Sequence, residues 1–146
     1  MPTTIDAPAL GSIMPDIALT AADGSAKSLR DLTSGRRAVV FFMRASSCPI
    51  CNAHVKKIER MATADAAVVI VTPGTAADAA SVSAKTSLQV LASGENGHAE
   101  AGLTRFLGLQ HSGTFVLDAE GRVIAARTAT LPTGSFDERE VLAALG

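Results

Sequence analysis

Cys48 and Cys51 are the side chains best suited to chemistry in this sequence, and they are its only two cysteines. The loop between them is too short for a disulfide there to work as a structural cross-link. Pro49 suits the first position of a helix, because its fixed φ is helical and its missing N–H would have no partner there. Cys48 would then be the N-cap, where unpaired N–H groups and the helix dipole favour a thiolate. The spacing therefore predicts a nucleophilic Cys48.

The two cysteines are expected to differ in exposure. Cys51, Val55 and Ile58 repeat at helical spacing and predict the inward face of a helix, whereas Lys56 and Lys57 point outward. Cys51 is therefore expected to be shielded and Cys48 exposed. Cys48 would attack the substrate, and Cys51 would resolve the resulting mixed disulfide or sulfenic acid.

Two other interpretations of the cysteines stay open. Cys48, Cys51 and His54 offer three metal ligands, and soft thiolates suit copper(I). A closed zinc site needs four ligands, and the chain has no second Cys-x-x-Cys. Two unreactive thiols packed in a helix are the third interpretation. Redox chemistry is favoured, because an apolar strand leads directly into a proline-containing motif at a helix start. No cofactor and no resident metal are expected.

Composition restricts the class of protein. The chain has 146 residues, 47 % of them apolar, and a net charge of −1. These values predict one domain over residues 1–146, with a loose arm over residues 1–12, and give no reason to expect nucleic acid as a partner. No apolar run approaches the ~20 residues that span a bilayer. The N-terminus lacks the basic and apolar regions of a secretion signal, so a cytoplasmic protein is expected. Nothing indicates an oligomeric state.

Helical and strand patterns alternate along the chain. Residues 38–43 are continuously apolar and predict a central strand covered on both faces. Ser135 and Glu138 fit a capping box for a last helix whose buried face would be Val141, Leu142 and Leu145. The order predicts an α/β fold with a mixed central sheet, helices on both faces and an N-terminal hairpin. Strands are expected at 17–20, 38–43, 67–71, 88–91, 114–117 and 122–125, and helices at 28–32, 49–62, 75–86, 98–107 and from 135 onward.

The sequence around the motif resembles the redoxin branch of the alkyl hydroperoxide reductase/thiol-specific antioxidant family, the peroxiredoxin-like proteins. The shared pattern is an apolar strand, an arginine, three residues and Cys-Pro-x-Cys, here residues 39–43, Arg44 and residues 48–51. The resemblance spans residues 10–146. Weaker matches are Gly11, Pro15-Asp16, Leu19, Gly24, Ser28-Leu29 and residues 68–71, 106–108, 114–118 and 121–123.

This resemblance implies a thioredoxin-like fold and thiol-dependent reduction of a hydroperoxide or a disulfide. Cys48 would be the attacking thiol, Cys51 its partner, and Arg44 the cation that stabilises the thiolate or the peroxide oxygens. An external dithiol, such as a thioredoxin or glutathione system, would reduce the resulting disulfide. A disulfide reductase without peroxidase activity is the alternative within the fold, and a copper-binding module the alternative outside it.

The sequence departs from the family at the substrate site. The proline and threonine that precede the cysteine in typical peroxiredoxins are Phe41 and Ala45 here, and their later arginine is Ser112. The residue that is a cis-proline in thioredoxins is Gly113. Either serine before Cys48 could supply the missing hydroxyl. The resemblance thus implies the substrate-binding residues Ser46, Ser47, Gly113 and Thr114. His111 beside them is a candidate for proton transfer or an ordinary surface histidine, and His98 is expected on the surface.

Overall fold

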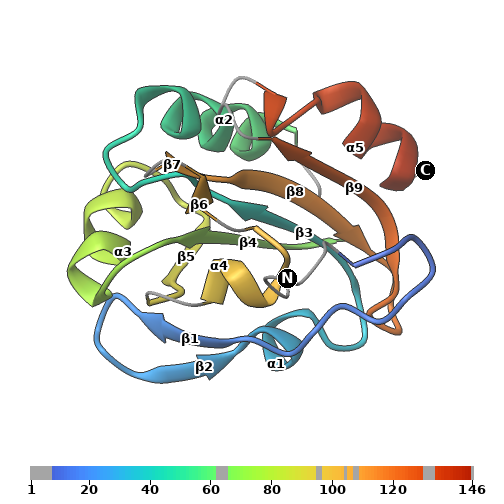
Figure 1. Cartoon of the computed structure of the whole chain (residues 1–146), viewed down its shortest axis with the longest axis horizontal. Coiled ribbons are helices and arrows are strands. Elements are labelled where there is room, and N and C mark those ends of the chain that lie inside the picture. Colours follow the sequence, from blue (N-terminus) through green and yellow to red (C-terminus); the bar gives the residue numbers. More distant parts are fainter. Residues whose placement is uncertain are drawn as a thin grey trace.

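The computed structural model describes residues 8–61, 66–94, 97–103, 105–106, 109–129 and 134–145. Its main sheet has seven strands in the order β2-β1-β5-β4-β3-β8-β9, and β6 and β7 form a separate pair (Figure 1). The strands are β1 (Ala18–Ala21), β2 (Ala26–Ser28), β3 (Arg37–Phe42), β4 (Ala66–Thr72), β5 (Gln89–Ala92), β6 (Arg105–Phe106), β7 (Leu109–Gln110), β8 (Ser112–Leu117) and β9 (Val123–Ala129). The helices are α1 (Leu29–Thr33), α2 (Pro49–Arg60), α3 (Ala76–Ser83), α4 (Gly97–Glu100) and α5 (Glu138–Leu145).

The sheet is mixed and has a buried core on each face. Strands β3, β4 and β5 pair in parallel, whereas β8 pairs antiparallel with both β3 and β9, and β1 pairs antiparallel with both β5 and β2. Helices α2, α3 and α5 pack on one face, and α1 and α4 on the other. The mixed sheet with helices on both faces, predicted from the sequence, is confirmed. Among the described residues, no helix is long and apolar enough to cross a membrane.

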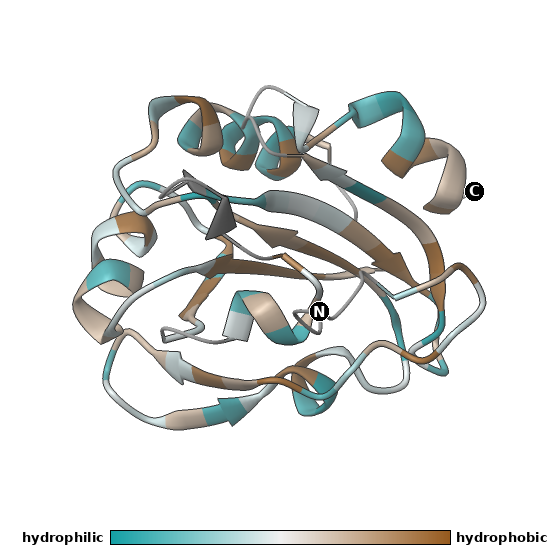
Figure 2. Ribbon diagram, viewed as in Figure 1, coloured by the Kyte–Doolittle hydropathy of each residue, from teal (hydrophilic) through white to brown (hydrophobic). Residues whose placement is uncertain are grey.

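Strand β3 lies between the two cores, contributes side chains to both, and leads at its end to the cysteines. Its alternating side chains divide between the faces, with Val39 and Phe41 on the α2 side and Val40 and Phe42 on the α1 side. All four are completely buried. Figure 2 shows the central strands as hydrophobic, whereas the helices that cover them alternate between polar and apolar residues. Burial on both faces explains why this strand reads as a continuous apolar run.

The N-terminal hairpin is also confirmed. Strands β1 and β2 pair around the turn at 22–25, and the Ser28 hydroxyl caps α1 by accepting from Asp31 N–H. Residues 1–7 of the predicted loose arm lie outside the described residues. The described end of the arm is hydrogen-bonded, because Gly11 N–H donates to Val123 O and Val123 N–H to Ser12 O.

Two predicted helices differ from the structure. The helix expected at 98–107 is only the four residues of α4, followed by β6, while residues 107 and 108 lie outside the described part. Gly102, at φ 79°, lets the chain turn away, and Leu103 N–H closes onto His98 O. In α5, the cap is Asp137, whose carboxylate accepts from the N–H groups of residues 139 and 140. Leu142, expected inside, is exposed.

Glu59 ties α2 to the loop between α3 and β5. Its Oε1 accepts hydrogen bonds from Ser87 N–H at 2.7 Å, Thr86 Oγ1 at 2.7 Å and Ser87 Oγ at 3.1 Å. These hydrogen bonds, the Ser87 N–H first among them, lower the pKa of Glu59 from 4.5 to about 2. The ionised carboxylate therefore joins two segments far apart in the sequence.

The contribution of Glu59 to stability is expected to depend on pH. Because its folded pKa is lowered, the contribution is complete above pH 4.5 and is lost as the pH falls through about 2. Thermal unfolding of Glu59→Gln should give a lower Tm than wild type at neutral pH, and the difference should vanish near the folded pKa. Glu120→Gln, on the exposed turn after β8, is the control. A Tm difference of constant size at every pH would contradict this assignment.

Candidate active site

The cysteines lie where β3 ends and α2 begins. Cys48 is the N-cap of α2, with an extended backbone (φ −67°, ψ 115°), and Pro49 opens the helix. Cys51 N–H donates to Cys48 Sγ at an N···S distance of 3.3 Å. The N-cap position inferred from the proline is therefore confirmed, and the Cys48 sulfur accepts one of the N–H groups at the helix start.

The exposure predicted for Cys48 is wrong. Cys48 is only 2 % exposed, and Cys51 is completely buried. Cys48 belongs to the buried apolar cluster on the α2 face of the sheet, which also includes Phe41 and Phe136. Pro49 and Ile50 form the surface instead. Both cysteines are free thiols in this structure.

The surroundings of the two thiols shift their pKa values in opposite directions. Burial raises the pKa of Cys48, but hydrogen bonds from Cys51 and Arg44 and the Arg44 charge outweigh it, so the pKa lies below 9.0. Burial, and then the hydrogen bond with Cys48, raise the pKa of Cys51 to about 12. Arg44 N–H offsets part of this by donating to Cys51 Sγ, 3.3 Å from its nitrogen. Cys48 therefore ionises first, and Cys51 keeps its proton.

A cleft of about 310 Å³ opens beside the segment that leads to Cys48. Ser46 lies in its wall and donates its hydroxyl hydrogen to Asp78 Oδ1 at 2.8 Å. Thr75 N–H donates to the other oxygen of Asp78 at 2.9 Å, and these bonds, that of Thr75 first, lower the pKa of Asp78. Ser47 is exposed and does not line the cleft. The lining residues are Arg44, Ala45, Ser46, Pro73, Gly74, Asp78 and Gln110.

The loop before Cys48 is held by a residue that the sequence did not single out. Asn52 Nδ2 donates to Ser46 O at 3.0 Å and to Cys48 O at 2.9 Å. An asparagine one turn into a helix carries no signal of this kind by itself. Asp78 was missed for the same reason, since its bond to Ser46 spans 32 residues.

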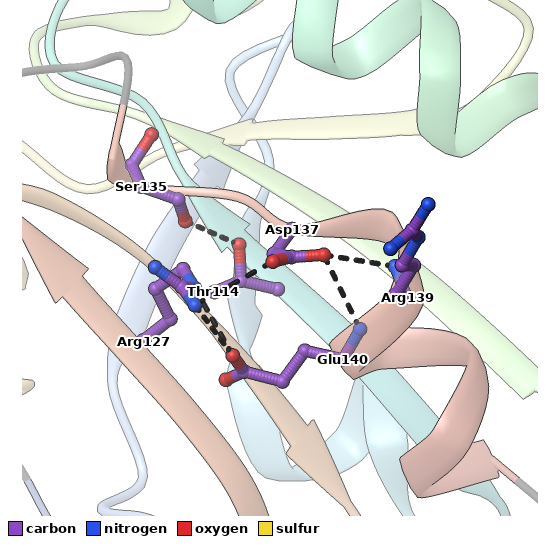
Figure 3. A network of polar contacts seen from close by, with 6 residues as sticks. All are labelled: Thr114, Arg127, Ser135, Asp137, Arg139 and Glu140. Atoms are coloured by element: carbon purple, nitrogen blue, oxygen red, sulfur yellow. Dashed lines mark hydrogen bonds and ion pairs between the residues drawn. The ribbon is translucent and has the colours of Figure 1, made fainter.

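Gly113 and Thr114 lie in strand β8, paired with Phe42 and Phe41. A Cβ on Gly113 would come within 2.5 Å of Arg127 O, so close packing against β9 requires glycine there. Thr114 Oγ1 donates to Ser135 O at 2.7 Å and fastens the segment before α5 (Figure 3). In the same network Arg127 donates to Glu140 and lies 3.6 Å from Asp137. A substrate-binding role for Gly113 and Thr114 stays a prediction.

Thr114→Val is expected to lower stability rather than activity. The change removes a buried hydrogen bond and should cost about 1–3 kcal/mol of the free energy of unfolding. Denaturant unfolding and the rate of Cys48 alkylation should be measured on the same protein. An unchanged free energy of unfolding with a slowed reaction would instead assign the hydroxyl to the substrate. Thr128→Val, on the exposed edge strand, is the control.

The three histidines lie in three different surroundings. His54 is buried in α2, with its ring against Phe41 and Phe136 at centroid distances of 5.8 and 5.4 Å. Within the described residues, no three His, Cys, Asp or Glu side chains are grouped to hold a metal ion. His98, expected on the surface, is 1 % exposed, because α4 turns its ring under the sheet against Phe42. His111 is half-buried just before β8.

Comparisons with solved structures confirm the thioredoxin-like fold. A peroxiredoxin-like protein from Aquifex aeolicus superposes with a TM-score of 0.82 at 15 % identity, covering 97 % of this chain and 88 % of that one. For a thiol peroxidase from Chromobacterium violaceum the TM-score is 0.79 at 13 % identity, with coverages of 99 % and 89 %. Peroxidoxin BcpB from Mycobacterium tuberculosis gives 0.78 at 22 % identity, with 93 % and 95 %.

Comparison with family models gives the family directly. A comparison with curated protein sequences finds no match. The family model described as Redoxin matches residues 9–145, which is nearly the whole chain and includes both cysteines. The chain belongs to the Redoxin family of thiol-dependent redox proteins.

Proposed function

We propose that this protein is a two-cysteine thiol peroxidase. The Cys48 thiolate attacks the outer oxygen of a hydroperoxide, the O–O bond breaks, and an alkoxide or hydroxide leaves with the electron pair and takes up a proton from solvent to give alcohol or water. Cys48 becomes a sulfenic acid. Cys51 then attacks the sulfur of Cys48, water leaves, and a Cys48–Cys51 disulfide forms. An external dithiol such as a thioredoxin or glutathione system returns both thiols.

The observation that carries the proposal is a group of buried polar atoms around the end of β3. Within the described residues, Arg44 Nε, His111 Nε2 and Ser112 Oγ are buried and have no hydrogen-bond partner. Such atoms are uncommon in folded proteins and call for an explanation. Peroxide reduction needs hydrogen-bond donors around two oxygens, since charge develops there as the O–O bond breaks.

Strand register brings the backbones of these three residues to the same end of the sheet. Phe42 pairs with Gly113, so the antiparallel register, continued past β3, sets Ser112 opposite Met43 and His111 opposite Arg44. Ser112 lies on the same face as Thr114, which is the face covered by α2. Arg44 in turn acts on Cys48 through a hydrogen bond and its charge. Ser112 thus stands where the family has an arginine and offers a neutral hydroxyl in its place.

A disulfide reductase is the second candidate, favoured by a different observation. Pro49 and Ile50, within the motif, are exposed, and Ile50 is 38 % exposed. Apolar side chains beside a reactive thiol suit a protein partner that docks before exchange. Ser46 also points this way, because its hydrogen is already donated to Asp78 and is not available to a peroxide oxygen.

One set of rapid-mixing experiments separates the two candidates. Pre-reduced protein is mixed with hydrogen peroxide, an organic hydroperoxide, or an aromatic disulfide, and remaining thiols are counted. A peroxidase should lose both thiols to a hydroperoxide far faster than free cysteine does. Ser112→Ala should slow the peroxide reaction and leave the disulfide reaction unchanged, with Ser34→Ala as control. Reaction with the disulfide alone would overturn the proposal in favour of the reductase.

A further inference from the structure

His98 is a buried histidine with hydrogen bonds at both ring nitrogens. Its Nε2 lies 2.7 Å from Met43 O, and its Nδ1 lies 2.6 Å from Ser93 Oγ. A carbonyl oxygen can only accept, so Nε2 carries the hydrogen, and in the neutral ring Nδ1 then accepts from the serine. The Phe42 ring meets the imidazole at 88° with centroids 5.0 Å apart, which fixes the plane of the ring. His98 therefore has one orientation.

The Met43 carbonyl that accepts from His98 belongs to the peptide group that bonds the second thiol, Cys51. Met43 C=O and Arg44 N–H belong to one planar peptide group, so orienting one end orients the other. Arg44 N–H donates to Cys51 Sγ at 3.3 Å. Met43 N–H donates to Val71 O at 2.8 Å, so the Phe42–Met43 peptide, just before this one, is fixed to β4. His98 lies on the α4 face of the sheet, and Cys51 on the α2 face. A single peptide group links the two.

The segment around α4 is fitted to keep His98 in place. A Cβ on Gly97 would lie 2.5 Å from Ser93 Cβ, so only glycine lets α4 approach this closely. Gly97 N–H donates to Ser93 O at 3.1 Å, and Ser93 N–H donates to Thr72 O at 2.9 Å. The serine that bonds the imidazole is thus fixed to β4 on one side and to α4 on the other.

We propose that His98 and Ser93 are positioning residues for Cys51, holding the Met43–Arg44 peptide so that its N–H stabilises the Cys51 sulfur as that sulfur becomes the attacking thiolate. The inference rests on the proposed role of Cys51 as the resolving thiol. In that step Cys51 gives its proton to solvent, bonds to the Cys48 sulfur, and the group on Cys48 leaves with the electron pair. Burial opposes charge on Cys51, and the Arg44 N–H is a group that counters it.

A chromogenic disulfide tests the inference without a natural substrate. Attack of Cys48 on dithiobis(nitrobenzoic acid) releases one thionitrobenzoate, and attack of Cys51 on the mixed disulfide releases a second, so stopped-flow absorbance resolves the two steps. His98→Leu should slow the second phase about tenfold and leave the first within about twofold, since the hydrogen bond from Arg44 N–H to the Cys51 thiolate loses its fixed orientation and acts at that step only. His98→Gln, whose amide N–H can reach Met43 O, should restore most of the second rate, and Ser93→Ala should fall between.

The controls separate positioning from packing. Val123, the first residue of β9, lies in the core on the α1 side at the opposite end of β3 from Met43, so Val123→Ala should change stability without changing the ratio of the two phases. Equal slowing of both phases in His98→Leu, or no advantage of His98→Gln over His98→Leu, would overturn the inference and leave the proposed function intact. A wild type that releases only one thionitrobenzoate would remove the resolving role of Cys51 itself, and the inference with it.

Discussion

Cys48→Ser is expected to abolish reaction with both hydroperoxides and disulfides, lowering the rate by at least about a thousandfold, because a serine hydroxyl is a far weaker nucleophile than a thiolate. The remaining thiol cannot compensate. Cys51 is completely buried, and its pKa is raised to about 12. The measurement is single-turnover consumption of hydrogen peroxide and of an aromatic disulfide by pre-reduced protein, with thiols counted at each time.

Cys51→Ser is the matched variant, since it changes the same atom three residues away. It should attack at a rate close to wild type and then stop, leaving a sulfenic acid that dimedone traps or a mixed disulfide that mass spectrometry detects. The serine hydroxyl can donate to Cys48 in place of the Cys51 thiol, so the first step should keep most of its rate. Two variants with equal, complete loss of the first step would contradict the division of roles.

Local patterns were enough to place the motif in the fold. Pro49 after Cys48 specifies a helix start, and the apolar residues before it specify a doubly covered strand, so both could be read from a few neighbouring residues. The hairpin around residues 22–25 is equally local. These features depend on spacing alone, which explains why the mixed sheet and the N-cap cysteine were predicted correctly.

The environment of the site could not be predicted in this way, because it depends on contacts between distant segments. His98 looked like a polar residue at a helix start, but Met43, 55 residues away, supplies its partner. Cys48 was expected to be exposed because the helical repeat placed only Cys51 on the inward face, whereas Cys48 is also part of the buried cluster on the α2 side. The capping box predicted Ser135 as the N-cap of the last helix, but Asp137 caps it instead. Ser135 is tied to β8, because Thr114 Oγ1 donates to its carbonyl oxygen.

Arg44→Gln is expected to raise the pKa of Cys48 and to slow its reaction at neutral pH about tenfold, because a smaller fraction of the thiol is then ionised. Burial raises the pKa of Cys48, whereas the hydrogen bond and the charge of Arg44 help to keep it below 9.0. Removing the charge should therefore raise this pKa. The measurement is the rate of iodoacetamide alkylation against pH. The midpoint of the wild-type profile should lie below that of an ordinary thiol, and the midpoint of Arg44→Gln should lie above the wild-type value.

Reaction rates at high pH show whether Arg44 has a role beyond stabilising the Cys48 thiolate. Once Cys48 is fully ionised, a residue that only stabilises the thiolate has no further effect, so the two alkylation rates should converge there. With hydrogen peroxide the deficit should persist at high pH, because the buried Arg44 Nε is a proposed donor to the peroxide oxygens. Arg44→Lys keeps the charge but not this planar donor and should recover the alkylation rate more than the peroxide rate. Arg36→Gln, just before the opposite end of β3, is the control. Convergence with both reagents would restrict Arg44 to electrostatic support of Cys48.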